Sequence, residues 1–141
     1  EIVVLGRGFA YPNAKETALK IQETSKINVQ GMSTADYLHG PISSVNADTQ
    51  VIFIAPHKMP ENSILEALSR IRPITNRIFW IGASSQALES DVKFGGSNCF
   101  DEITSSIVDS IVLQKVALNL AVNNGFNPDY PEGLTKVTMT I

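Results

Sequence analysis

The sequence has little of several features that mark particular classes of protein. It contains a single cysteine, Cys99, which excludes an internal disulfide and any metal site built from several cysteines. The ordinary interpretation of Cys99 is a small buried side chain in a reducing compartment. Basic residues are also few, because 11 Lys and Arg stand against 14 Asp and Glu and are scattered along the chain. This distribution indicates no nucleic-acid partner.

Long hydrophobic runs are missing as well. The longest runs, at 51–55 and 78–83, have the length of strands and are interrupted by polar or turn-forming residues. No run reaches the length that a bilayer requires, and no signal-peptide pattern opens the chain. We therefore expect no membrane-spanning segment and a cytoplasmic location.

The length of the chain allows one domain. With 141 residues, 43% of them apolar, the chain can form a single core but has no room for a second domain. It opens at Glu1 and enters an apolar run at once, without a Met or a flexible leader. We expect residues 1–141 to be one domain taken from a longer polypeptide.

The hydrophobic pattern predicts an α/β fold. Apolar and β-branched runs predict strands at 2–5, 49–55 and 77–82, a brief extended piece at 27–29 and a short edge strand at 98–100. Helices are expected at 12–23, 35–38, 63–72 and 104–123, with Thr104 as the N-cap of the last. Because helices separate the strands, we expect parallel strands joined by right-handed crossovers. Residues 127–141 contain two prolines and a glycine, which indicates an arm rather than one regular element.

The helix at 12–23 has two distinct faces. Small or apolar side chains form one narrow face that suits close packing on a sheet: Ala14, Ala18, Ile21 and Ser25. Glu16, Lys20 and Glu23 lie on the opposite face. Spacing alone favours a solvated set of ion pairs there, and a functional role needs further evidence.

A histidine follows the short helix at 35–38. His39 stands directly before Gly40 and Pro41, on a loop of the kind that often carries catalytic groups. The alternative is a side chain that hydrogen-bonds its own turn.

Neither candidate loop for a phosphate has the expected chemistry, because 6–8 is too short for a dinucleotide fingerprint and 56–63 lacks a run of Ser, Thr and Gly.

Three separated motifs together resemble a known family. They are GRGFAYPNAKETALKIQETS at 6–25, STADYLHGP at 33–41 and NPDYPEGLTKVT at 127–138. Their order and spacing resemble the sugar isomerase (SIS) domain family, and within it the second SIS lobe of glucosamine-6-phosphate synthase and its relatives. The resemblance implies a three-layer αβα sandwich with a parallel, flavodoxin-like sheet and a C-terminal arm. It covers nearly the whole chain as a single SIS domain.

The resemblance also implies roles for individual residues. Glu23 corresponds to the carboxylate that moves a proton between C1 and C2 of the open-chain sugar, and Lys20 to the lysine beside it. His39 corresponds to the histidine that opens the sugar ring and that is contributed across a subunit interface, which implies a homodimer. Lys136 corresponds to the lysine that forms an imine with the sugar carbonyl, and Thr135 is expected to bind the substrate. Without the family, Lys136 would be interpreted as a tail lysine in water.

The chain departs from the complete synthase in what it contains. The first SIS lobe, whose Ser- and Thr-rich loop holds the sugar phosphate, is absent, and so is the glutaminase domain. Both are expected as partners upstream, together with a phosphosugar substrate such as fructose 6-phosphate or glucosamine 6-phosphate. No cofactor and no metal are expected. A glucosamine-6-phosphate deaminase or a fructosamine deglycase, built from two lobes, stays open as an alternative.

A non-catalytic module that senses phosphosugars is a further alternative, of the kind found in some transcriptional regulators. Such a module would not need Glu23, His39 and Lys136 all in place, and no helix-turn-helix or basic segment is present. The retention of all three residues favours an enzyme.

Overall fold

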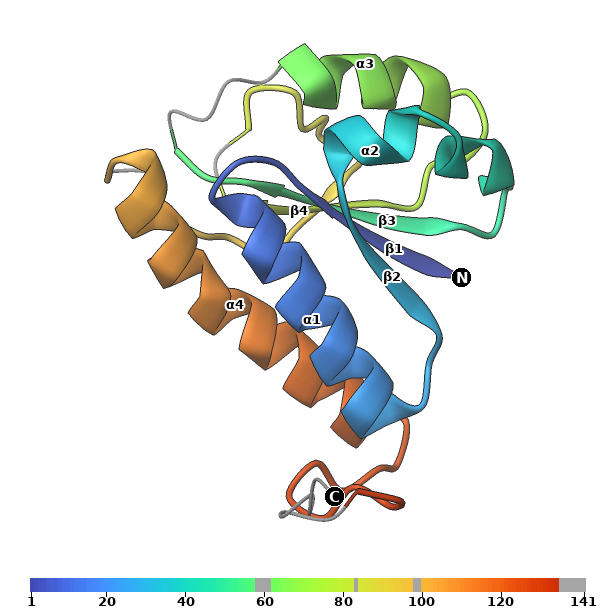
Figure 1. Ribbon diagram of the computed structural model, residues 1–141, viewed down its shortest axis with the longest axis vertical. Coiled ribbons are helices and arrows are strands. Elements are labelled where there is room, and N and C mark those ends of the chain that lie inside the picture. The colour runs from blue at the N-terminus through green and yellow to red at the C-terminus, as the bar shows by residue number, and fades with distance from the viewer. Residues whose placement is uncertain (58–61, 83, 98–99, 135–141) are drawn as a thin grey trace, which may run out of the picture.

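The fold is a five-stranded parallel sheet between two layers of helices (Figure 1). The structure is a computed structural model that describes residues 1–57, 62–82, 84–97 and 100–134. The strands are β1 (Ile2–Gly6), β2 (Val29–Ser33), β3 (Gln50–Ala55), β4 (Ile78–Gly82) and β5 (Val92–Lys93), in the spatial order β2-β1-β3-β4-β5. The α/β sandwich predicted from the sequence is confirmed.

Helices of unequal length cover the two faces of the sheet. One face carries α1 (Ala10–Ser25) and α4 (Glu102–Asn123), which lie side by side (Figure 1). The other carries α2 (Thr34–Leu38), the 3-10 helix η1 (Pro41–Ser44) and α3 (Asn62–Ile71). Each face has its own buried cluster. One lies between the sheet and α3 and is centred on Val3, Phe53 and Trp80. The other lies between the sheet and the helices α1 and α4 and is centred on Val4, Ile54 and Ile81. Strand alternation sends neighbouring side chains to opposite faces, which explains the two clusters.

The small face of α1 packs as its sequence predicts. Ala14, Ala18, Ile21 and Ser25 are all buried. The helix comes so close to the sheet that a side chain on Gly31 of β2 would meet the backbone of Ala14 and Lys15. Small residues on both elements are therefore what allows α1 to lie flat on the sheet edge.

One edge of the sheet is β5, a strand that the sequence does not predict, where Val92 pairs with Phe79. Positions 98 and 99 of the short edge strand expected at 98–100 fall outside the described residues. The Phe94 N–H donates to the Trp80 carbonyl at 2.9 Å, and the Phe94 ring stacks on Phe79 with centroids 5.9 Å apart. The sequence around β5 is polar, so no hydrophobic run signals a strand there.

The start of α4 also differs from the prediction. Asp101, rather than Thr104, is the N-cap, and its carboxylate accepts the backbone N–H groups of Ile103 and Thr104, both at 3.0 Å. The Thr104 hydroxyl donates to the same carboxylate at 2.8 Å. Both Asp and Thr are good N-caps, and the helix extends one turn further than the hydrophobic pattern indicates.

The length and composition of α4 bear on the expectation that no segment spans a membrane. One helix of the described part, α4, is long and apolar enough to cross a bilayer by those two criteria. No long hydrophobic run marks α4 in the sequence. Its polar residues are mostly uncharged Ser, Gln and Asn, which interrupt the apolar runs without adding charge. In this structure α4 packs against α1 and below the sheet, and 33% of its most apolar window is buried.

Candidate functional site

The last two turns of α1 bring Lys20 and Glu23 together. The Lys20 ammonium donates to Glu23 Oε2 at 2.8 Å, and its distance to Glu16 Oε1 is 3.8 Å. The hydrogen bond to Glu23 raises the pKa of Lys20, against burial that lowers it, and the charges of Glu23 and Glu16 raise it further. Lys20 therefore stays a cation at neutral pH, and Glu23 is held as its hydrogen-bond acceptor.

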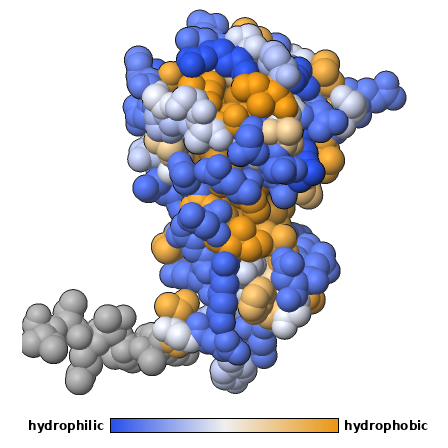
Figure 2. Space-filling view, turned by 90° about the vertical axis from the view of Figure 1, so that its right-hand side faces the viewer, coloured by the Kyte–Doolittle hydropathy of each residue, from blue (hydrophilic) through white to orange (hydrophobic). Residues whose placement is uncertain are grey.

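Glu23 is less exposed than a solvated surface pair would be. Its side chain is 29% exposed, against 54% for Glu16 on the same helix. The difference has a structural cause, because the chain after α4 turns back beneath the end of α1. We call residues 124–134 the arm segment. It forms the lower end of the molecule in Figures 1 and 2, where polar and apolar surface lie next to each other.

A cavity of about 190 Å³ lies between the end of α1 and the arm segment. Its walls carry carboxylate, ammonium, phenol and ring groups: Glu23, Thr24, Lys26, Phe126, Tyr130, Pro131 and Glu132 among them. The arm segment contains no helix or strand, as the Pro and Gly content of the sequence predicts. The cavity gives Glu23 an enclosed side, and a carboxylate so placed can accept a proton from a bound molecule.

Two of the predicted site residues cannot be placed. Thr135 and Lys136 follow the arm segment directly in the sequence and lie outside the described residues. Their predicted roles stay predictions.

His39 lies at the end of α2, on the other face of the sheet from Glu23. Its backbone N–H donates to the Asp36 carbonyl at 3.1 Å, but its imidazole has no hydrogen bond among the described residues. The alternative in which the side chain bonds its own turn is therefore not what the structure has. Within one chain, the structure brings Lys20 to Glu23 but does not bring His39 to either.

The cleft beside His39 contains a cation, Arg7, for which the sequence motifs give no role. It measures about 430 Å³ and is lined by Arg7, Ala35, Leu38, Asn62, Ser63 and Glu66 as well as His39. The Arg7 guanidinium forms no ion pair or hydrogen bond with any described residue. Arg7 follows β1, at the edge of the sheet where α/β proteins bind ligands. Its place directly after a buried strand is a sequence signal that can identify such a residue.

A second feature without a sequence signal is Lys26, which follows α1 in a left-handed conformation with φ 55°. The left-handed region favours Gly and Asn, so nothing in the sequence indicates it at a lysine. Elsewhere, no group of three or more His, Cys, Asp or Glu in the described part of the chain could hold a metal ion.

Comparison with known proteins identifies the family. Residues 1–71 match the family model described as the SIS domain. The chain belongs to the SIS domain family. The match covers β1 to β3 and α1 to the end of α3, and this part of the chain carries Lys20, Glu23 and His39.

Relatives of this SIS domain include a curated enzyme. The chain is 31% identical over 135 residues to the glutamine–fructose-6-phosphate aminotransferase [isomerizing] of Methanothermobacter thermautotrophicus, a match that covers 94% of this chain and 23% of the relative. It thus spans about a quarter of the length of the curated relatives it matches.

Solved structures have the same fold. The C-terminal domain of glucosamine-fructose-6-phosphate aminotransferase from Francisella tularensis superposes with a TM-score of 0.79 at 21% identity, over 89% of this chain and 36% of that one. Tagatose-6-phosphate ketose/aldose isomerase from Escherichia coli gives a TM-score of 0.77 at 25% identity, over 99% of this chain and 40% of that one.

Proposed function

We propose that this SIS domain is the C-terminal isomerase lobe of a phosphosugar aminotransferase or isomerase of the glucosamine-6-phosphate synthase type. One observation supports this most directly: Glu23, the partner of Lys20, lines a cavity whose other wall is the arm segment, and Thr135 and Lys136 follow the arm segment directly in the sequence. The relatives include an isomerizing aminotransferase and a ketose/aldose isomerase. In both reactions a proton changes carbon next to a carbonyl group.

In this proposal Glu23 is the proton shuttle. Its carboxylate takes the proton from C1 of the open-chain ketose, giving an enediol-type intermediate, and returns it to C2 to give the aldose. One base beside both carbons serves both transfers, because the carboxylic acid formed by taking the C1 proton is the donor to C2, and O2 gains a proton while O1 loses one. Exchange of the carboxylic acid proton with solvent before its return would place deuterium on the product. Lys20, which donates a hydrogen bond to Glu23 at 2.8 Å, orients the carboxylate beside the cavity.

His39 opens the sugar ring by moving a proton between the ring oxygen and the hydroxyl group. Because His39 and Glu23 occupy opposite faces of the sheet, a single chain does not unite them. The proposal therefore requires a homodimer in which His39 of one protomer acts on the sugar bound beside Glu23 of its partner. Lys136 forms the imine with the sugar carbonyl, releasing water, and Thr135 binds the substrate.

The complete enzyme needs more than this domain. We place a first SIS lobe upstream to hold the sugar phosphate, and for glutamine-dependent transfer a glutaminase domain as well. The single cysteine fits a reducing compartment, so the proposal includes a cytoplasmic location. A glucosamine-6-phosphate deaminase, a fructosamine deglycase and a sensor module are the alternatives.

The test replaces Glu23 by Gln in the complete enzyme and measures ketose to aldose conversion together with the uptake of solvent deuterium at C1 and C2. Removal of a general base should lower the rate by at least about 100-fold while the circular dichroism spectrum is unchanged. Glu16→Gln is the matched control, since Glu16 lies on the same helix about two turns before Glu23 and also faces Lys20. Near-normal turnover of the Glu23→Gln enzyme would refute the assignment.

The mass of the natural polypeptide separates the alternatives. Two lobes with an additional amidotransferase domain support the synthase, and two lobes alone support a deaminase or deglycase. A mass close to that of these 141 residues would favour the sensor module.

A further inference from the structure

The backbone of Lys26 is in a conformation that its residue type does not favour. With φ 55° and ψ 26° it is the one non-glycine residue with positive φ in the described part of the chain. Its N–H donates to the Gln22 carbonyl at 3.1 Å and ends α1, but any residue can make that bond. Gly or Asn would terminate the helix with less strain. A reason for a lysine must therefore lie in its side chain.

The Lys26 side chain contacts two residues of the arm segment. Its ammonium donates to the Glu132 carboxylate, and it lies 5.7 Å from the centroid of the Phe126 ring, within the range of a cation–π interaction. The hydrogen bond and the charge of Lys26 lower the pKa of Glu132. One cation thus contacts the arm segment at its beginning and near its end.

At the start of the arm segment the Asn124 side-chain amide donates to the Leu120 carbonyl of α4 at 2.7 Å. Beyond Asn124, no described side chain other than Lys26 connects the arm segment to the body by a hydrogen bond, ion pair or ring contact. The remaining backbone bonds of the arm segment are local, such as Phe126 N–H to the Ala121 carbonyl at 3.0 Å and Tyr130 N–H to the Asn127 carbonyl at 3.2 Å. These bonds shape the segment but do not hold it beneath α1. Lys26 also lines the cavity next to Glu23, so the contact and the candidate site share a wall.

We infer that Lys26 is a positioning residue, which holds the arm segment against the end of α1 and so keeps in place the cavity wall opposite Glu23. This inference rests on the proposed function and adds to it a residue with no role in the family resemblance. The strained backbone fits such a task, because the left-handed turn points the side chain away from the helix and toward the arm segment.

The deciding variant is Lys26→Asn in the complete enzyme. Asn accepts the left-handed conformation, so α1 keeps its end and the melting temperature stays the same or rises, while both arm contacts are lost. An exposed ion pair and a cation–π contact together change the docked population on the order of tenfold, and we expect kcat/KM to fall by about that factor. Lys26→Arg, which restores charge and reach, should recover most of it. Lys15→Asn, an exposed lysine of the same helix, is the matched control.

Salt gives a readout that a purely structural role would not move. The ion pair is exposed, so raising the ionic strength from about 0.05 to 0.5 M should lower kcat/KM of the wild type and leave that of Lys26→Asn nearly unchanged. The double exchange Lys26→Glu with Glu132→Lys should restore the salt dependence.

Backbone ¹⁵N relaxation of this chain tests the contact without any assay of activity. The order parameters of residues 124–134 should fall in Lys26→Asn and stay high in Lys15→Asn. Unchanged order parameters overturn the inference, and so does a loosened arm segment with unaltered kcat/KM. If Glu23→Gln leaves the complete enzyme active, the proposed function fails, and the relaxation data still decide whether Lys26 holds the arm.

Discussion

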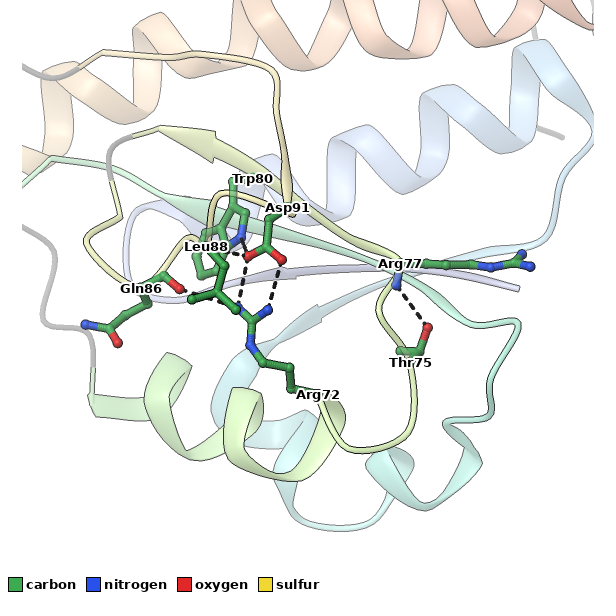
Figure 3. A network of polar contacts seen from close by, with 7 residues as sticks. All are labelled: Arg72, Thr75, Arg77, Trp80, Gln86, Leu88 and Asp91. Atoms are coloured by element: carbon green, nitrogen blue, oxygen red, sulfur yellow. Dashed lines mark hydrogen bonds and ion pairs between the residues drawn. The ribbon is translucent and has the colours of Figure 1, made fainter.

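The Arg72 guanidinium donates two parallel hydrogen bonds to the Asp91 carboxylate, Nη1 to Oδ1 and Nη2 to Oδ2, each 2.9 Å long (Figure 3). The same carboxylate accepts the Trp80 indole N–H and the Leu88 backbone N–H, both at 2.9 Å. The Asp91 side chain is only 2% exposed. This buried carboxylate connects the segment after β4 to the end of α3. Removing one partner of such a buried charge pair lowers the stability of the fold, because the other charge is left buried and unpaired.

The first prediction concerns acid stability. Burial alone would raise the pKa of Asp91, but the hydrogen bonds from Arg72, Trp80 and Leu88 and the charge of Arg72 lower it to about 2. A carboxyl whose pKa is lower in the folded state stabilises the fold above its ordinary pKa and loses that contribution as the pH falls toward 2. The loss is on the order of 2 kcal/mol.

The measurement is the free energy of unfolding by urea at pH values between 2 and 7. Wild type should lose stability below about pH 4, and Asp91→Asn should lack this component of the slope while being less stable at pH 7. Arg77→Met is the control, because Arg77 pairs with Asp48, whose side chain is 83% exposed. Parallel curves for wild type and Asp91→Asn would contradict the assignment.

The second prediction concerns a carboxyl with the opposite shift. Asp109 of α4 is fully buried, and its Oδ1 accepts the Ser97 N–H at 2.6 Å while Oδ2 has no partner among the described residues. Burial raises the pKa of Asp109, and the Ser97 N–H offsets only part of this. Because the folded state disfavours the charged form, stability falls as the pH rises from the ordinary pKa through the raised one.

Replacing Asp109 by Asn should therefore raise the free energy of unfolding at pH 7 relative to wild type, and the gain should shrink as the pH falls to about 3. The carbonyl of Asn keeps an acceptor for Ser97. Asp109→Leu removes that acceptor and should destabilise at every pH. A pH-independent difference between Asn and wild type would show that the charge of Asp109 is not the cause.

The sequence predicts those parts of the fold that depend on local patterns of residues, and not those that depend on tertiary contacts. The strands at 2–5 and 49–55 and the small face of α1 are local patterns, and each was predicted. The Arg72–Asp91 pair joins residues 19 apart across an irregular loop, and β5 has only two residues, so neither has a periodic signal. Such features depend on tertiary contacts that a pattern of hydrophobic residues does not contain.

The candidate site also has a part that local patterns predict and a part that they do not. The contact of Lys20 with Glu23 follows from their spacing on a helix, and their side-chain geometry agrees with it. Spacing does not predict that Glu23 faces a cavity, because the opposite wall comes from residues about a hundred positions later. It also does not predict that His39 lies across the sheet, since the crossover between α1 and α2 decides that.

The last prediction tests the close approach of α1 to the sheet, on which the position of Lys20 and Glu23 depends. A Cβ on Gly31 would lie within 2.9 Å of Lys15 Cα and closer still to the Ala14 carbonyl, atoms of the backbone that cannot rotate away. Gly31→Ala should therefore displace α1 from β2 and lower the free energy of unfolding by about 1–3 kcal/mol. The control is Gln30→Ala, since Gln30 is exposed next to it in β2. If α1 moves and the proposed function holds, the isomerase activity of the complete protein should also fall by more than the unfolded fraction explains. A Gly31→Ala protein as stable as the control would mean that the helix tolerates a wider spacing than the structure implies.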